Sequence, residues 1–134
     1  MRSPSAYVRV APFCLVDDVD QVVNWYVAVF GARIQARLPE QPPFEWVSLR
    51  LGDVEIMFSR KDSVQEWYSD RVKVSDAPAN FIAYIYVTGA DELWDRVRDR
   101  VLVLMEPTDQ PYGIREFAIQ DPFGFSLIFA EILE

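Results

Sequence analysis

Two segments of the chain carry apolar residues at the spacing of an α-helix. In the first, the apolar positions are Val19, Val22, Val23, Tyr26, Val27 and Phe30. This i, i+3, i+4, i+7 stripe predicts a helix over 19–30. Asp18 and Gln21 have the spacing of a capping box, and Gly31 can adopt the positive φ of a C-cap. The second stripe predicts a helix over 91–100, with apolar positions at Leu93, Trp94, Val97 and Val101.

Alternating or β-branched and aromatic segments predict the strands. The expected strands cover 7–16, 34–38, 44–51, 54–60, 81–87, 102–105, 114–120 and 125–130. A hairpin is expected across Gly52-Asp53, because a two-residue turn fixes the pairing of its strands. Its apolar pairs are Leu51–Val54, Leu49–Ile56 and Val47–Phe58, on a face suited to a core. Its other face is mixed and suited to a wet cleft, with pairs Arg50–Glu55, Ser48–Met57 and Trp46–Ser59.

The turn sequence Asp121-Pro122-Phe123-Gly124 predicts a second hairpin near the end of the chain, because proline fixes φ early in the turn and glycine accepts a positive φ late in it. A four-residue turn places Gln120 opposite Phe125. One face would then carry Phe117, Ile119, Ser126 and Ile128, and the other Ala118, Leu127 and Phe129. One face can pack on a helix, while the other, beginning with Arg115, would line a cavity or an interface.

The order strand, helix, strand, strand, strand occurs twice, so the chain contains an internal repeat. Val16 and Val87 are equivalent positions, and the same offset of about 71 residues carries the Gly52 turn onto the 121–124 turn. The sequence therefore predicts one α+β domain built from a module over 6–60, a linker over 61–79 with at most one helical turn, and a module over 80–134.

A family resemblance rests on the closing hairpin. Arg115-Glu116-Phe117, a short strand, the 121–124 turn and an apolar strand resemble the end of the glyoxalase / bleomycin-resistance / extradiol-dioxygenase superfamily, which has the vicinal oxygen chelate fold. The segment 110–113 resembles the bleomycin-resistance branch. With the repeat, the resemblance covers about residues 10–131. It implies two βαβββ modules whose curved mixed sheets surround a cleft, and it implies a homodimer.

Composition and charge narrow the classes of function. The chain has 134 residues, of which 51% are hydrophobic, enough for one domain with a core. No apolar run approaches the roughly 20 residues of a membrane span, and no signal-peptide pattern is present, so we expect a cytoplasmic protein that does not bind membrane. A net charge of −8 disfavours nucleic acid and favours a cationic ligand, although solubility alone is the simpler explanation. The single cysteine, Cys14, is expected to be a small buried hydrophobe.

The chain contains no histidine, the commonest metal ligand and the usual general base. The resemblance implies that metal-binding members hold the ion at four cleft positions, which correspond here to Ala11, Ile82, Ile128 and Glu55. One oxygen donor cannot hold a catalytic metal, and Glu55 has a simpler role as the cross-strand ion-pair partner of Arg50. We therefore expect no metal and no other cofactor, and the sequence favours binding over enzymatic activity, with Glu55 or Glu45 left as a conceivable carboxylate base.

The predicted cleft has an aromatic, largely apolar wall with a few polar anchors, a composition typical of small-molecule sites. Its candidate ligand-binding residues are Phe13, Trp46, Arg50, Glu55, Met57, Tyr84, Tyr86, Tyr112, Arg115, Phe117 and Ile128. The leading hypothesis is a metal-free homodimer that sequesters an aromatic ligand, such as a cationic drug, as bleomycin-resistance proteins do. The alternatives are a metal-dependent glyoxalase-type lyase, isomerase or dioxygenase with an atypical ligand set, and a module whose cleft is vestigial and which associates with a partner. The rings could also simply pack a core or a dimer.

Overall fold

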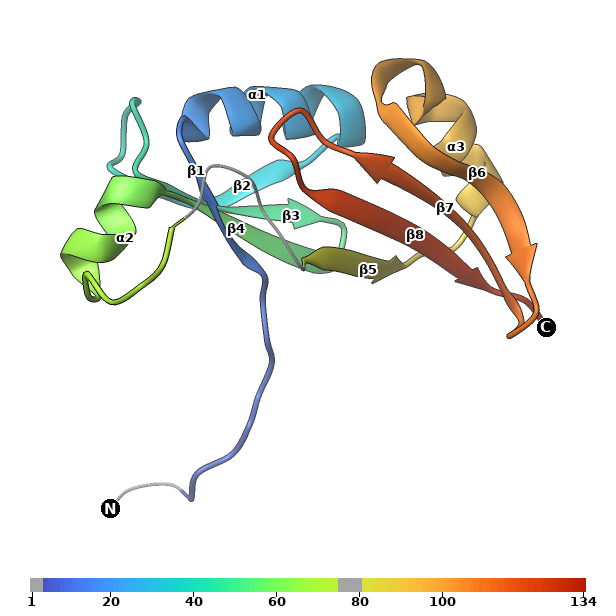
Figure 1. Ribbon diagram of the computed structural model, residues 1–134, viewed down its shortest axis with the longest axis horizontal. Helices are drawn as coiled ribbons and strands as arrows, with labels where there is room; N and C mark the ends of the chain where they lie inside the picture. The colour runs from blue at the N-terminus through green and yellow to red at the C-terminus, as the bar shows by residue number, and fades with distance from the viewer. Residues whose placement is uncertain (1–3, 75–80) are drawn as a thin grey trace.

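The computed structural model describes residues 4–74 and 81–134, which form two four-stranded sheets and three α-helices (Figure 1). The first module contains β1 (Phe13–Val16), α1 (Val19–Phe30), β2 (Arg33–Leu38), β3 (Trp46–Leu51) and β4 (Val54–Arg60). A short helix, α2 (Lys61–Trp67), follows. The second module contains β5 (Ile82–Tyr86), α3 (Ala90–Val97) with the 3₁₀ turn η1 (Arg98–Arg100), β6 (Leu102–Gln110), β7 (Ile114–Gln120) and β8 (Ser126–Ile132).

The two modules have the same topology. The strand orders are β1-β4-β3-β2 and β5-β8-β7-β6, and in each sheet the first pair is parallel while the other pairs are antiparallel. Helices α1 and α3 both pack on one side of the two sheets and leave the opposite side without a long helix (Figure 1). We call that opposite side the open face. The predicted α+β fold with two βαβββ modules is confirmed.

The two long helices begin in different ways. In α1, the Asp18 side chain accepts a hydrogen bond from the Gln21 N–H, and Gly31 ends the helix at φ 69°, as the sequence predicted. In α3, the N-cap is Gly89, which has no side chain to offer. The Glu131 carboxylate accepts from the N–H groups of Gly89 and Ala90 instead, at 3.2 and 3.0 Å. The end of β8 therefore supplies the cap of α3, which explains the mutual orientation of these elements.

The register of the first hairpin is the predicted one, with Leu49 opposite Ile56 and Arg50 opposite Glu55. The predicted register of the second hairpin is wrong by one residue, since Gln120 pairs with Ser126 rather than Phe125. The Asp121 side chain explains the difference: its Oδ1 accepts from the N–H groups of Phe123 and Phe125, at 2.9 and 2.8 Å. The loop therefore has five residues, and every side chain after it changes face relative to the prediction.

One hydrophobic core joins the modules. Ring contacts cross from one module to the other between Phe30 and Phe129 and between Phe58 and Phe125, with centroids 5.3 and 6.2 Å apart. A buried hydrogen bond adds to them: the Tyr26 hydroxyl on α1 donates to Asp121 Oδ2 at 2.6 Å. Because these contacts connect α1 and β4 to the second hairpin, the modules form a single packed unit.

Three predicted boundaries changed. The first strand starts at Phe13 rather than residue 7, and the described residues from 4 to 10 run away from the sheets (Figure 1). The strand predicted at 102–105 continues to Gln110 because it pairs with β7 along that length. The linker forms a seven-residue helix at its start, and its last residues, 75–79, lie outside the described part. Within the described residues, no helix is long and apolar enough to cross a membrane.

Candidate functional site

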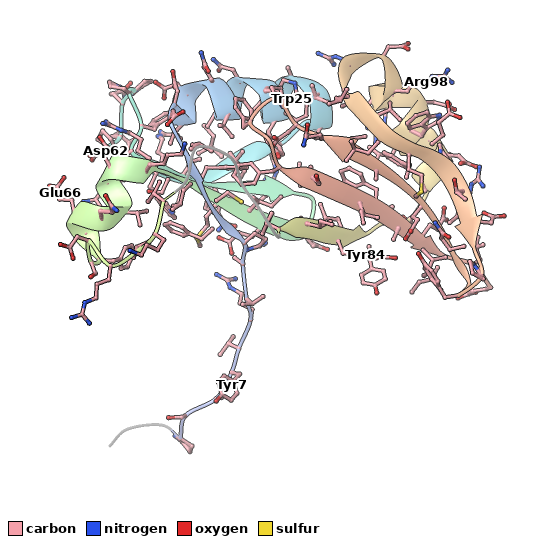
Figure 2. All side chains as sticks on the ribbon, in the orientation of Figure 1. Tyr7, Trp25, Asp62, Glu66, Tyr84 and Arg98 are labelled. Carbon is pink, nitrogen blue, oxygen red and sulfur yellow. The ribbon has the colours of Figure 1, made fainter. Side chains whose placement is uncertain are left out.

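The strand registers decide which candidate residues lie on the open face. Core residues Cys14, Val47 and Phe58 face the helices, so their alternating neighbours face the other way. On this basis the first module contributes Phe13, Trp46, Arg50, Glu55 and Met57 to the open face. The second module contributes Tyr84, Tyr86 and Ile128, since Ala83, Ile85, Leu127 and Phe129 are the buried set. Tyr84 projects on the side away from the helices (Figure 2).

The shifted hairpin register removes two predicted residues from this face. Phe117 is fully buried on the helix side, where it stacks on Phe129 and meets the edge of Trp94. Arg115 also lies on that side and donates to Asp91 Oδ1 and Asp109 Oδ1, both at 2.9 Å. The hydrogen bonds to these two carboxylates raise the pKa of the Arg115 guanidinium. The predictions that Phe117 and Arg115 face the cleft are therefore wrong.

The carboxylate of Glu55 lies opposite Arg50 in the register but has other partners. It accepts hydrogen bonds from Ser48 Oγ at 2.5 Å and Gln35 Nε2 at 3.0 Å. Arg9, which precedes β1, places its guanidinium 3.7 Å from the other carboxylate oxygen. The expected ion pair with Arg50 is wrong, because Arg50 instead donates to the Asp53 carbonyl. Glu55 is therefore part of a polar cluster of the first module.

A buried carboxylate on the open face, that of Glu116, was missed from the sequence. It is 5% exposed and lies on the open face, since its neighbour Phe117 is on the helix side. The Tyr84 hydroxyl donates to its Oε2 at 2.6 Å and the Tyr112 hydroxyl to its Oε1 at 2.7 Å. These hydrogen bonds to the carboxylate are the main cause that raises the pKa of both phenols, which therefore stay protonated. Counting a five-residue loop in the hairpin would have placed Glu116 on this face.

The residues at the family's metal positions do not fit a metal ion. Phe13 pairs with Met57 in the first module and Tyr84 with Ile128 in the second, and each residue is 71 positions from its counterpart. The position equivalent to Ile128 is therefore Met57, whereas Glu55 corresponds to Ser126. The expectation that Glu55 occupies the fourth position is corrected by this register. With Ala11, Met57, Ile82 and Ile128, the four positions offer no hard donor, and no cluster of three His, Cys, Asp or Glu occurs among the described residues.

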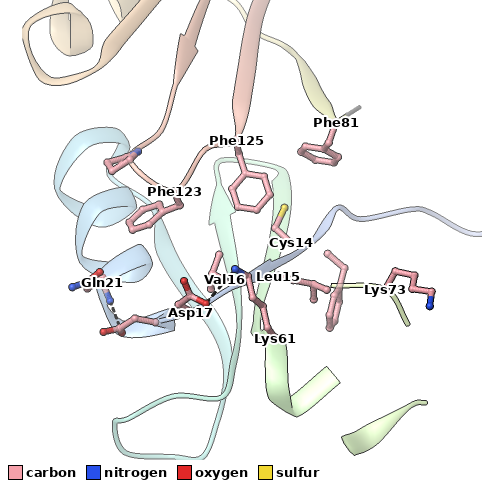
Figure 3. Close-up of a pocket in the computed structure, with 13 residues that line it drawn as sticks. Cys14, Leu15, Val16, Asp17, Gln21, Lys61, Lys73, Phe81, Phe123 and Phe125 are labelled. Carbon is pink, nitrogen blue, oxygen red and sulfur yellow. Dashed lines mark hydrogen bonds and ion pairs between the residues drawn. The ribbon is translucent and has the colours of Figure 1, made fainter. Parts of the chain in front are cut away.

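Two hollows lie along the seam between the modules. One, of about 500 Å³, is lined by residues that include Phe13, Cys14, Lys61, Phe81 and Phe125 (Figure 3). Burial, followed by the charge of Asp121, raises the pKa of the Cys14 thiol to about 12, so this thiol is not a nucleophile. A second hollow of about 730 Å³, at the other end of the seam, includes Tyr86. Most candidate residues line neither hollow and lie on an open surface.

Part of the open face of the first module is covered by the segment after β4. Helix α2 contacts β1 and β4, and Tyr68 meets Phe13 edge-on with centroids 6.3 Å apart. Val64, Tyr68 and Val72 form with Phe13 and Leu15 an apolar hollow of about 230 Å³. This segment therefore forms a wall beside Phe13, while Tyr84 and Tyr86 in the second module have no such cover and are 40% and 64% exposed.

Comparison with protein families agrees with this geometry. The family model described as "Glyoxalase/Bleomycin resistance protein/Dioxygenase superfamily" matches residues 9–129. The chain belongs to this superfamily. The match includes both modules and the intervening segment, so the glyoxalase/bleomycin-resistance fold accounts for nearly the whole chain. A search of curated protein sequences gave no significant match.

Several solved structures have the same fold. TioX from Micromonospora sp. ML1 is 23% identical with a TM-score of 0.73, over 95% of this chain and 100% of that one. The bleomycin-binding protein from bleomycin-producing Streptomyces verticillus, solved with copper(II)-bleomycin, is 22% identical with a TM-score of 0.64, over 94% and 97%. The bleomycin resistance determinant encoded on transposon Tn5 is 16% identical with a TM-score of 0.69, over 94% and 98%. At these identities the likeness is one of fold.

Proposed function

We propose that this protein is a metal-free binding protein of the bleomycin-resistance type, which sequesters an aromatic small molecule without changing it. The observation that carries the proposal is the set of aromatic rings that are exposed to solvent on the open face. Phe13, Tyr84 and Tyr86 are 38%, 40% and 64% exposed, although residues of this size are normally buried. Exposed rings on a rigid sheet give a planar ligand a large contact area at a small entropic cost.

The side chains at the expected metal-ligand positions favour binding over metal-dependent catalysis. The four positions at which the superfamily's enzymes hold an ion carry Ala11, Met57, Ile82 and Ile128 here. Apolar side chains at these positions extend the aromatic surface and cannot polarise a substrate oxygen. The bleomycin-binding protein and the bleomycin resistance determinant add independent support for a drug-like ligand, since they share this fold over nearly their whole length.

A second copy of the chain would complete the site. On a single chain the open face is a surface without a facing wall, whereas small-molecule sites enclose most of their ligand. Exposed Ile82, at 60%, and Tyr86 extend the apolar area beyond what one planar ligand covers. We therefore propose a homodimer. Its cleft is formed either by two open faces or by one open face and the segment that precedes β1 in the partner subunit.

Tryptophan fluorescence provides the test, because Trp46 lies on the open face. Titration with bleomycin and with copper(II)-bleomycin should change the emission with a Kd in the micromolar range or below. Tyr84→Ala and Phe13→Ala should weaken binding by at least tenfold, whereas Val27→Ala, which truncates an exposed side chain on α1, should leave it unchanged.

Two results would overturn parts of the proposal. Stoichiometric nickel, zinc, manganese or iron in the purified protein, together with turnover that a chelator abolishes, would replace binding by catalysis. The homodimer would be refuted if light scattering at a working concentration of 50 to 100 µM protein gave the mass of a monomer. Absence of any bleomycin signal would remove bleomycin as the ligand and, if a panel of planar drugs also failed, the binding function.

A further inference from the structure

Glu116 has an unusual environment on the open face. The residue is buried, with 5% exposure, and its two carboxylate oxygens each accept one hydrogen bond from a phenol. The phenols come from different elements, Tyr84 from β5 and Tyr112 from the β6–β7 turn. A carboxylate can accept about four hydrogen bonds, so roughly two lone-pair positions remain unused. The cluster is thus hydrogen-bonded but not saturated.

The charge of Glu116 has no cationic partner within residues 4–74 and 81–134. The adjacent Arg115 projects to the other side of the sheet, where Asp91 and Asp109 engage it. Glu55, the carboxylate on the open face of the first module, differs because the Arg9 guanidinium lies 3.7 Å from it. Buried charges in proteins are normally paired, because desolvation is costly. The unpaired negative charge of Glu116 therefore creates a local attraction for a cation that comes from outside the chain.

The tyrosines give that cation a surface to contact. Tyr84 and Tyr86 stack with centroids 5.3 Å apart and planes 25° apart, and both rings are substantially exposed. The hydrogen bond that Tyr84 donates to Glu116 fixes its hydroxyl inward and leaves the ring available on the open face. Aromatic ring faces attract ammonium and guanidinium groups, and the attraction grows when solvent is excluded.

We propose that Glu116, Tyr84, Tyr86 and Tyr112 form a subsite for an organic cation, an ammonium or guanidinium group attached to a larger ligand. The cation lies against the tyrosine rings, and the carboxylate beneath them supplies the opposite charge. An inorganic metal ion is not the expected occupant, because one carboxylate and two neutral phenols are too few hard donors to displace its water shell. This proposal rests on the proposed function, because it places the ligand on the open face. It specifies in addition that one group of the ligand is positively charged and that these four residues bind that group.

The test compares two small probes that differ in charge but little in shape, phenylguanidinium and neutral phenylurea. Both are titrated into the full chain labelled with ¹³C at the tyrosine rings, and binding is followed by NMR. Phenylguanidinium should shift the ring signals of Tyr84 and Tyr86 in a saturable way, with an affinity at least tenfold above that of phenylurea. Raising the salt concentration should reduce this preference, since it arises from charge.

Glu116→Gln removes the charge while the amide can still accept from one tyrosine hydroxyl and donate to the oxygen of the other. It should lower the preference for phenylguanidinium by at least fivefold. Glu92→Gln on α3, an equal change of charge on the opposite side of the second sheet, should leave the preference unchanged. If circular dichroism shows that Glu116→Gln is unfolded, Tyr86→Leu provides the second variant, because this exposed side chain contributes to the ring surface and not to the core. It should weaken phenylguanidinium by at least fivefold.

Equal affinities for the two probes, or an unchanged preference in Glu116→Gln, would overturn the subsite. So would shifts confined to the tyrosines outside the subsite, Tyr7, Tyr26 and Tyr68. These outcomes are separate from the bleomycin titration: probe selectivity without bleomycin binding would leave the subsite standing and refute only the proposed drug. Bleomycin binding with no selectivity between the probes would refute the subsite and leave the proposed function standing.

Discussion

The hydrogen bond between Tyr26 and Asp121 allows a quantitative test of how the modules are joined. Tyr26→Phe removes the hydroxyl that donates to the Asp121 carboxylate at 2.6 Å and keeps the ring, which contacts Phe58 and Phe30. Both partners are buried, at 1% and 3% exposure. A hydrogen bond to a charged group contributes about 1.5–3 kcal/mol, so we expect a loss of about 2 kcal/mol at pH 7. For a chain of this length that corresponds to a decrease in Tm of roughly 8 °C.

The loss should depend on pH in a defined direction. Burial raises the pKa of Asp121, while the hydrogen bond from Tyr26 is the largest of the effects that lower it. A carboxyl whose pKa is higher in the folded state stabilises the fold below its unfolded pKa and loses that contribution as pH rises through the folded value. Removing Tyr26 raises the pKa of Asp121 further, so the loss with rising pH becomes larger. The cost of Tyr26→Phe should therefore be greater at pH 7 than at pH 4.

Urea denaturation followed by tryptophan fluorescence at both pH values measures this cost, and the difference between variant and wild type cancels most other titrating groups. Asp121→Asn is the matched control, because its amide can accept from the loop N–H groups and donate to the Tyr26 oxygen without titrating. In that background Tyr26→Phe should cost less at pH 7 than it does in the wild type, and its cost should be the same at both pH values. A cost below about 0.5 kcal/mol at pH 7, or an equal cost in the Asp121→Asn background, would refute the reasoning.

Three further predictions concern the core, the thiol and a helix cap. Phe117→Ala should cost about 3–5 kcal/mol in urea denaturation, whereas Tyr86→Ala should change stability by no more than about 0.5 kcal/mol; similar costs would contradict the hairpin register. Cys14, whose pKa is raised to about 12, should react with iodoacetamide at pH 8 only in denaturant, and rapid labelling of the folded protein, detected by mass spectrometry, would show that the thiol is accessible. Glu131→Ala should cost about 1 kcal/mol and speed amide exchange in the first turn of α3; unchanged exchange there would mean that the carboxylate is not its cap.

Local signals predicted the first module well. The helix at 19–30 has its expected bounds because an apolar stripe and two caps all indicate the same segment. The first hairpin has its expected register because Gly52-Asp53 is a two-residue turn, which leaves little freedom in pairing. In contrast, residues 7–11 are strand-like in sequence but belong to no strand of the structure, and the backbone contact with β4 begins at Pro12, whose carbonyl accepts from the Met57 N–H.

The second hairpin shows why part of the candidate site could not be predicted. The loop length depends on the Asp121 side chain, which accepts two backbone N–H groups and so includes Phe125 in the loop. Pattern analysis counts residues between β-prone runs and does not see such a hydrogen bond. A shift of one residue exchanged Phe117 for Glu116 on the open face. Side-chain clusters such as Glu116 with Tyr84 and Tyr112 also join segments about 30 residues apart, which no local pattern identifies.

The aromatic contacts that cross the seam have a consequence for how this repeat protein can be divided. Phe58 contacts the ring of Phe125, and Phe129 contacts the ring of Phe30. Cutting the chain between the repeats would therefore expose large apolar areas on both fragments. Neither half, produced alone, should be a stable folded polypeptide, although the duplicated topology invites that experiment. Mixed together, the two fragments should reassemble through the same rings, so this chain is a natural candidate for a split reporter.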